Sequence, residues 1–112
     1  MSQNKSVRAK ILDFKLLAHG EVCRELGQRL RVQRLTKNLK QQDLADRAGV
    51  AVGTIKNIES KGRSSLESLV RVIMALNLIH ELEGLFTLKI RSIAQMEKLE
   101  NLNLEKIPRR AR

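Results

Sequence analysis

The stretch from residue 39 to residue 59 constrains the fold of this chain more than any other. Two short amphipathic segments meet there at Gly49. Their apolar residues recur with the spacing of helix faces, with Leu44, Ala45 and Ala48 before the glycine and Ile55 and Ile58 after it. A glycine readily adopts the left-handed backbone that ends many helices, so Gly49 predicts the end of the first segment. The stretch therefore predicts two short helices joined by a tight turn.

The charge of the chain favours a polyanionic partner. The 112 residues carry a net charge of +10, and the sequence pI is about 10.5. The excess lies outside the helix pair: residues 1–37 hold nine Lys or Arg against three Asp or Glu, residues 38–88 hold six of each, and residues 89–112 hold seven against three. We interpret the flanking segments as phosphate contacts; the alternative is that charged arms only keep a small protein soluble.

Several classes of function are not expected. Two Phe and no Tyr or Trp disfavour binding to single strands, which relies on aromatic stacking, so duplex DNA is favoured over RNA. Cys23 is the one cysteine, and His19 and His80 stand apart from it, so we expect no disulfide, metal site, cofactor, small-molecule substrate or catalytic residue. No apolar run approaches 18 residues and no signal-peptide core is found, so we expect a cytoplasmic, nucleoid-associated bacterial protein without a membrane contact.

The apolar periodicity predicts an all-α fold with five helices, over residues 21–36, 41–48, 51–60, 64–76 and 79–86. In the first we expect four residues to face inward: Val22, Leu26, Leu30 and Leu35. The fourth begins with the capping-box pair Ser64 and Glu67 and ends near Asn77. Its expected buried face consists of Leu66, Leu69, Val72, Ile73 and Leu76.

The ends of the chain are predicted as extensions of this domain, with an N-terminal arm at residues 1–20, the domain at 21–86 and a C-terminal extension with a basic tail at 87–112. Residues 12–16 and 88–91 alternate like strands, although residues 8–18 are equally compatible with a helix. Short strands need partners, which a swapped arm or an intermolecular sheet across a two-fold axis would provide. Ser92 then caps a possible last helix with one apolar face, formed by Ile93, Met96 and Leu99.

A wider pattern of residues surrounds the helix pair. It consists of Leu26-Gly27, Leu30-Arg31, Arg34, Leu39, Gln41, Leu44-Ala45, Ala48-Gly49-Val50, Thr54-Ile55, Ile58-Glu59 and the run from Ser64 to Leu69. In this pattern, residues 22–86 resemble the XRE/Cro family of lambda-repressor-like helix-turn-helix domains. The resemblance implies five helices, binding of a dimer to a double-stranded DNA operator, and no enzymatic activity. It also implies that Gln41 holds a DNA phosphate and that Arg34 and Glu59 form an ion pair.

In such a domain the helix at 51–60 would enter the major groove of DNA. We expect five residues of this helix to read the DNA bases: Val52, Gly53, Thr54, Lys56 and Asn57. Phosphate contacts are expected from Lys40, Gln41, Ala51, Ser60, Lys61 and Arg63. The alternative is that these polar residues are simply solvated. The chain also departs from the family, because Lys40 and Ala51 replace capping residues and Val52 and Gly53 stand where amides often read bases.

Apolar residues on one side of the helix at 79–86 predict a homodimer interface, formed by Leu78, Leu82, Leu85 and Phe86. The alternative is that the N-terminal arm covers them. The function predicted is a dimeric, sequence-specific repressor that autoregulates its operon as a HipB-like antitoxin, with a HipA-like kinase toxin as its partner. This antitoxin step rests on analogy with the fold. The alternatives are a phage-type or restriction-controller repressor, and a non-catalytic protein-interaction adaptor with weak base readout.

Overall fold

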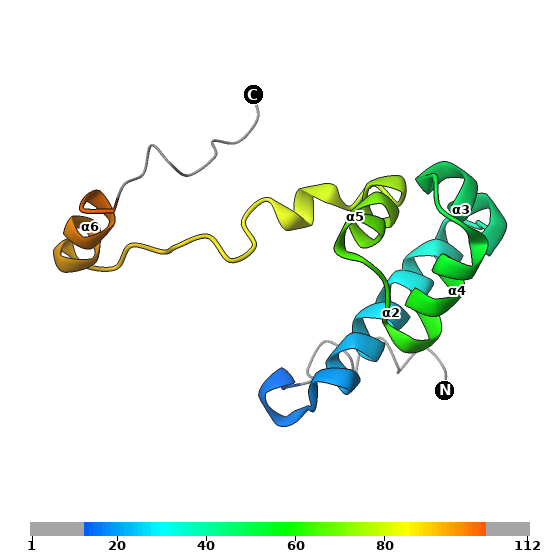
Figure 1. Ribbon diagram of the computed structural model, residues 1–112, viewed down its shortest axis with the longest axis horizontal. Helices are drawn as coiled ribbons and strands as arrows, with labels where there is room; N and C mark the ends of the chain where they lie inside the picture. Colours follow the sequence, from blue (N-terminus) through cyan, green and yellow to red (C-terminus); the bar gives the residue numbers. More distant parts are fainter. Residues whose placement is uncertain (1–12, 103–112) are drawn as a thin grey trace.

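The structure, a computed structural model, describes residues 13–102 as an all-α protein. Its elements are η1 (Phe14–Leu16), α2 (His19–Thr36), α3 (Gln41–Ala48), α4 (Val52–Lys61), α5 (Leu66–Ala75), η2 (Ile79–Leu82) and α6 (Ile93–Glu100), where η denotes a 3-10 helix. Helices α2 to α5 lie together, whereas α6 stands at the other end of the molecule beyond an extended segment (Figure 1). The predicted all-α fold class is confirmed for the described residues.

The two central helices meet as the glycine predicts. Helix α3 ends at Gly49, whose backbone is left-handed with a φ of 70°. At its other end, the side chain of Lys40 makes no capping bond, but the Lys40 backbone N–H donates to the Asp43 carboxylate at 2.9 Å. The Asp43 carboxylate also places a negative charge at the positive end of the helix dipole. Helix α3 therefore begins without the usual hydroxyl or amide cap.

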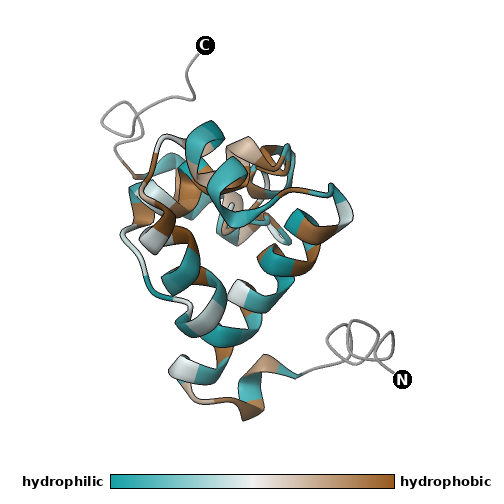
Figure 2. Cartoon of the chain, turned by 90° about the vertical axis from the view of Figure 1, so that its right-hand side faces the viewer, coloured by the Kyte–Doolittle hydropathy of each residue, from teal (hydrophilic) through white to brown (hydrophobic). Residues whose placement is uncertain are grey.

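The core lies between α3, α4 and α5. Its buried apolar residues are Leu39, Leu44, Ala45, Ala48, Ile55, Ile58, Val72 and Leu76. Hydrophilic and hydrophobic residues alternate along the helices, as expected when each helix buries one side (Figure 2). Burying a Leu or Ile side chain contributes about 1.5–3 kcal/mol each to folding, so this cluster fixes the position of α4 relative to its two neighbours.

The inward face of α2 differs from the prediction. Leu26 and Leu35, both expected to be buried, are exposed. The face turned toward α4 is offset from the predicted one: it runs through Cys23, Gly27, Leu30 and Arg34, so that only Leu30 belongs to both. The offset has a physical reason, because the α4 backbone approaches so closely that only a glycine fits at its centre. A search for large apolar residues overlooks both a glycine and a buried arginine.

The start of α5 also differs from the prediction by one residue. Its cap is Ser65, whose hydroxyl accepts a hydrogen bond from the Ser68 backbone N–H at 3.0 Å, so the predicted cap at Ser64 is wrong. Leu66 is exposed rather than buried, since it lies in the first turn beyond the edge of the core. Asn77, with a left-handed φ of 63°, follows the end of the helix as expected.

Beyond α5 the predicted helix at 79–86 is wrong in its second half. The 3-10 helix η2 covers only Ile79–Leu82, and turns follow it around Gly84, a residue that disfavours a helix interior. The predicted strands are also wrong within the described residues: Phe14–Leu16 is a 3-10 turn, and residues 88–91 are extended but unpaired. Leu12 lies outside the described residues. The last helix is confirmed, with the Ser92 hydroxyl accepting from the Gln95 backbone N–H at 3.1 Å.

Candidate nucleic-acid interface

Helix α4 has a buried side and an exposed side. Ile55, Ile58 and Glu59 are buried. The opposite side is open to solvent and carries Gly53, Lys56, Asn57, Ser60 and Lys61. Positions three, four and seven apart lie on one face of a helix, so these residues form a single stripe, which we call the α4 stripe. An exposed stripe of this kind can enter the major groove of DNA, because the helix is held in place by its opposite, buried side.

The first turn of α4 contributes little to this stripe. Val52 is half-buried and packs against the core, and Thr54 is also half-buried. Gly53 is exposed but has no side chain. Of the five residues expected to read bases, the structure therefore leaves two long polar side chains on the stripe, Lys56 and Asn57. Asn57 offers both a donor and an acceptor, which matches the edge of an adenine in the major groove.

Arg34 and Glu59 meet in the interior beneath α4. The Arg34 Nε donates to Glu59 Oε2 at 2.7 Å and its Nη2 donates to Glu59 Oε1 at 3.0 Å, a paired arrangement. The remaining Nη1 donates to the Leu39 carbonyl oxygen at 2.6 Å. Both side chains are buried, with exposed fractions of 7% and 4%. Because the desolvation of a buried pair offsets most of its attraction, its main effect is to fix the orientation of α4.

Two glutamines strengthen this connection. The Gln28 side-chain amide on α2 donates to the Glu59 carbonyl oxygen at 2.7 Å. The Gln41 amide on α3 donates to Glu59 Oε1 at 3.0 Å. An amide nitrogen carries two N–H groups, so Gln41 keeps a second donor for another acceptor. The last turns of α4 are thus tied to both neighbouring helices at one residue.

A hollow of about 360 Å³ opens at this junction between α2, α3 and α4. Its lining residues are Gln28, Arg31, Gln41, Lys56, Glu59 and Ser60. Arg31 is half exposed, and its Nε lies 4.0 Å from Glu59 Oε1. The carboxylate of Glu59 therefore faces two guanidinium groups, Arg31 and Arg34, which leaves an excess of positive charge at the hollow. A hollow with this charge can accept an anionic oxygen of a phosphate group.

Arg31 and Gln28 were not among the residues predicted for the site. A signal for Arg31 exists in the sequence, since it precedes Arg34 by three positions and shares its helix face. The signal for Gln28 is weaker, because its contact is with a backbone carbonyl rather than with a recognisable side-chain partner.

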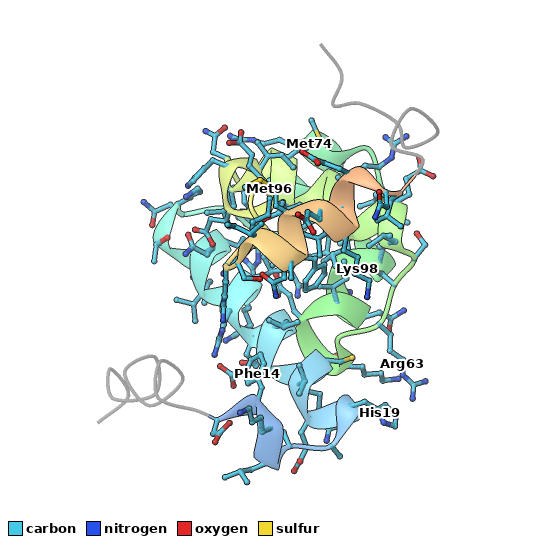
Figure 3. The ribbon with its side chains drawn as sticks, turned by 90° about the vertical axis from the view of Figure 1, so that its left-hand side faces the viewer. Phe14, His19, Arg63, Met74, Met96 and Lys98 are labelled. Carbon is cyan, nitrogen blue, oxygen red and sulfur yellow. The ribbon has the colours of Figure 1, made fainter. Side chains whose placement is uncertain are left out.

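The remaining residues expected at phosphates lie around the α4 stripe. Lys40 and Ala51 are exposed at the starts of α3 and α4, and Lys61 ends α4. Arg63 follows Gly62 and extends away from the body of the molecule (Figure 3). Within residues 13–102, no ion pair engages Lys40, Lys61 or Arg63. The Ser60 hydroxyl donates to the Lys56 carbonyl oxygen at 2.7 Å, so its proton is already engaged.

The four residues predicted at a dimer interface divide into two pairs. Leu78 and Leu82 are half-buried, and Leu78 packs against the core. Leu85 and Phe86 are exposed, with exposed fractions of 49% and 91%. Leu78 thus helps to support the core, whereas Leu85 and Phe86 have most of their surface open to solvent.

The described part of the chain contains no group of three potential metal ligands, and Cys23 is a half-buried free thiol. None of the helices within residues 13–102 has the length and apolar character needed to cross a membrane.

Comparison with known proteins agrees with this arrangement. Residues 30–83 match the Helix-turn-helix family model, a span that begins within α2, contains α3, α4 and α5, and ends just after η2. No curated protein matches the chain. Residues 30–83 are thus a helix-turn-helix domain of the XRE/Cro type, and this match supports a DNA-binding transcription regulator.

Proposed function

We propose that this regulator is a dimeric repressor that recognises a specific operator. The observation that carries the proposal is the α4 stripe, exposed on a helix whose opposite side is locked by Glu59 to α2 and α3. In the proposed complex, α4 lies in the major groove. Asn57 forms paired hydrogen bonds with an adenine, and Lys56 donates to a guanine or a nearby phosphate. The locked orientation matters because base readout requires these side chains to reach the base edges in one register.

The DNA backbone is held on both sides of this contact. We propose that the hollow beside Arg31 and Gln41 receives one phosphate, while Lys40, Lys61 and Arg63 contact others. Ala51 offers its exposed backbone at the start of α4 rather than a side chain. Each neutralised phosphate releases condensed counterions, so affinity should fall steeply with salt.

Within this reading the protein represses its own operon as a HipB-like antitoxin whose partner is a HipA-like kinase. The support is the resemblance of the extensions on both sides of the domain to those of HipB-type antitoxins. A decisive observation is the gene beside this one. If it encodes a kinase-like protein that arrests growth when expressed alone, co-expression of this chain should restore growth, and the two proteins should co-purify. Failure to restore growth would favour a phage-type or restriction-controller repressor.

Operator recognition is tested directly by binding to the DNA upstream of the gene. We expect protection of a two-fold symmetric site there, with affinity about 10³-fold or more above that for a shuffled duplex of the same length. Affinity should be measured over a range of salt concentrations for both duplexes, because phosphate contacts and base contacts differ in salt dependence.

A specific feature of α4 supports a second candidate function. Val52 is half-buried and Gly53 has no side chain, so few groups in the first turn are available to read bases. An adaptor that keeps the fold but uses another surface for a protein partner would show this pattern. Equal affinity for the upstream DNA and the shuffled duplex would favour the adaptor.

A further inference from the structure

The segment that joins α5 to α6 exposes much apolar surface. We refer to residues 79–91 as the connecting segment; it includes η2 and the extended part that leads away from the body (Figure 1). Phe86 and Leu88 are the most exposed of its apolar residues, at 91% and 71%, and three others are also exposed: Ile79, Leu85 and Ile90. Exposed apolar surface gathered on one segment in this way is a candidate interaction surface.

The charges of the connecting segment are divided about its middle. Glu81 and Glu83 precede Phe86, and Lys89 and Arg91 follow it. All four side chains are exposed, and within residues 13–102 none of them forms an ion pair. Phe86 itself has a left-handed backbone, with a φ of 62°, which separates the two halves. The segment thus has an acidic half, a central aromatic residue and a basic half.

We propose that the connecting segment docks on the connecting segment of a second copy of this chain, in antiparallel orientation. A two-fold axis brings the same surface of both copies together, so residue i meets residue j and j meets i. With the axis near Phe86, the acidic half of each copy faces the basic half of the other, and the exposed apolar residues cover one another. This inference rests on the dimer of the proposed function and specifies its surface.

The charge pattern is the reason for choosing a second copy as the occupant. A surface for an unrelated protein needs to complement only that protein. The connecting segment instead carries both members of a complementary set, and they are equally spaced along the sequence about one residue: Glu83 and Lys89 are each three positions from Phe86, and Glu81 and Arg91 are each five. Antiparallel self-pairing gives each of the four charges an opposite charge on the other copy, and each acidic–basic pair occurs twice in the dimer.

The experiment compares two charge-reversed forms of the full-length chain. One carries Glu81→Lys with Glu83→Lys, and the other carries Lys89→Glu with Arg91→Glu. Each change leaves two like-charged halves facing one another, so we expect each variant alone to dimerise at least about tenfold more weakly than the native chain in analytical ultracentrifugation. An equimolar mixture should recover a heterodimer, and a chain with all four reversals should recover the homodimer.

The design controls for overall charge and for folding. Net repulsion predicts the opposite for the second variant, since it lowers the net charge from +10 by four and should then favour association. All four positions are exposed and lie outside the core, so circular dichroism should show the native helix content in every form. The preference of the native chain for its operator over a shuffled duplex tests base reading by the α4 stripe separately.

Three results would overturn the proposal. A native dimer that neither variant weakens places its interface elsewhere on the chain. Weakened variants whose mixture stays dissociated show that the acidic and basic halves do not face one another. If the native chain is a monomer both free in solution and on its operator, the dimer of the proposed function and this dimer surface are both wrong. DNA binding by the α4 stripe would remain as proposed.

Discussion

Gly27 on α2 lies directly against the carbonyl oxygen of Ile58 on α4, and a Cβ atom at this position would overlap that oxygen. A second glycine, Gly62 at the end of α4, lies as closely against the backbone of Cys23 on α2. These two contacts bring the helices together along their backbones. The approach lets Gln28 and Arg34 on α2 reach Glu59 on α4. The ion pair beneath α4 therefore depends on the absence of side chains at two glycines.

The first prediction concerns this close approach. Gly27→Ala should lower the free energy of unfolding by about 1–3 kcal/mol, because the new methyl group has no space and the helices must move apart. The higher helix propensity of alanine opposes this loss by only about 1 kcal/mol. Thermal unfolding followed by circular dichroism measures the change.

Gly53→Ala provides the matched control. Gly53 is also in a helix, but apart from its chain neighbours and the backbone of its own helix no atom lies within 4 Å of where its Cβ would be. The same substitution should therefore leave stability unchanged or raise it by up to about 1 kcal/mol. Equal destabilisation by both changes would mean that the close approach of α2 and α4 does not determine the effect.

The second prediction concerns Arg34 and Glu59. Glu59→Ala should destabilise the domain by about 3–5 kcal/mol, since it leaves the Arg34 guanidinium buried without its carboxylate. Replacing both residues, as Arg34→Met with Glu59→Leu, should cost less than the sum of Arg34→Met and Glu59→Leu made singly, because no charge then remains buried. Urea unfolding of the two single variants and the double variant gives this coupling energy. Additive losses would contradict a direct interaction between the two side chains.

Much of the domain can be predicted from the sequence. The buried residues Leu44, Ile55 and Ile58 recur with helical periodicity, and Gly49 marks the turn, so the pair of central helices follows from local patterns alone. Such patterns depend on one helix and the side that it buries. The exposure of Lys56 and Asn57 follows from the same periodicity, since they lie opposite the buried isoleucines.

The parts that were missed depend on contacts between helices. The inward face of α2 is centred on Gly27, and its reason lies on α4, 31 residues further along at Ile58. Arg31 belongs to the site only because α2 and α4 cross beside Glu59. The helix predicted at 79–86 fails for a different reason. Its apolar spacing is helical, but little of the chain packs on it, so Gly84 and the preceding left-handed Asn77 decide its conformation.

The third prediction tests the hollow beside Glu59 as a phosphate site. Arg31→Ala should weaken binding to the operator and to a shuffled duplex by a similar factor, and it should reduce the salt slope by about one. Arg47→Ala is the control, since it removes the same charge from an exposed position on α3 that faces a separate hollow toward α5. We expect little change from Arg47→Ala. Equal effects of the two variants would show that only overall charge matters and that the hollow holds no phosphate.

The last prediction separates base reading from phosphate binding on α4. Asn57→Ala should lower affinity for the operator by about 1–3 kcal/mol, because the paired hydrogen bonds to one base are lost. Affinity for the shuffled duplex and the salt slope should stay nearly unchanged, since no charge is removed. Lys61→Ala and Arg63→Ala should do the reverse, weakening binding to both duplexes and flattening the salt dependence. Fluorescence anisotropy titrations at several salt concentrations measure both quantities. If Asn57→Ala weakens both duplexes equally, Asn57 faces the backbone rather than a base, and α4 enters the groove in a different orientation from the one proposed.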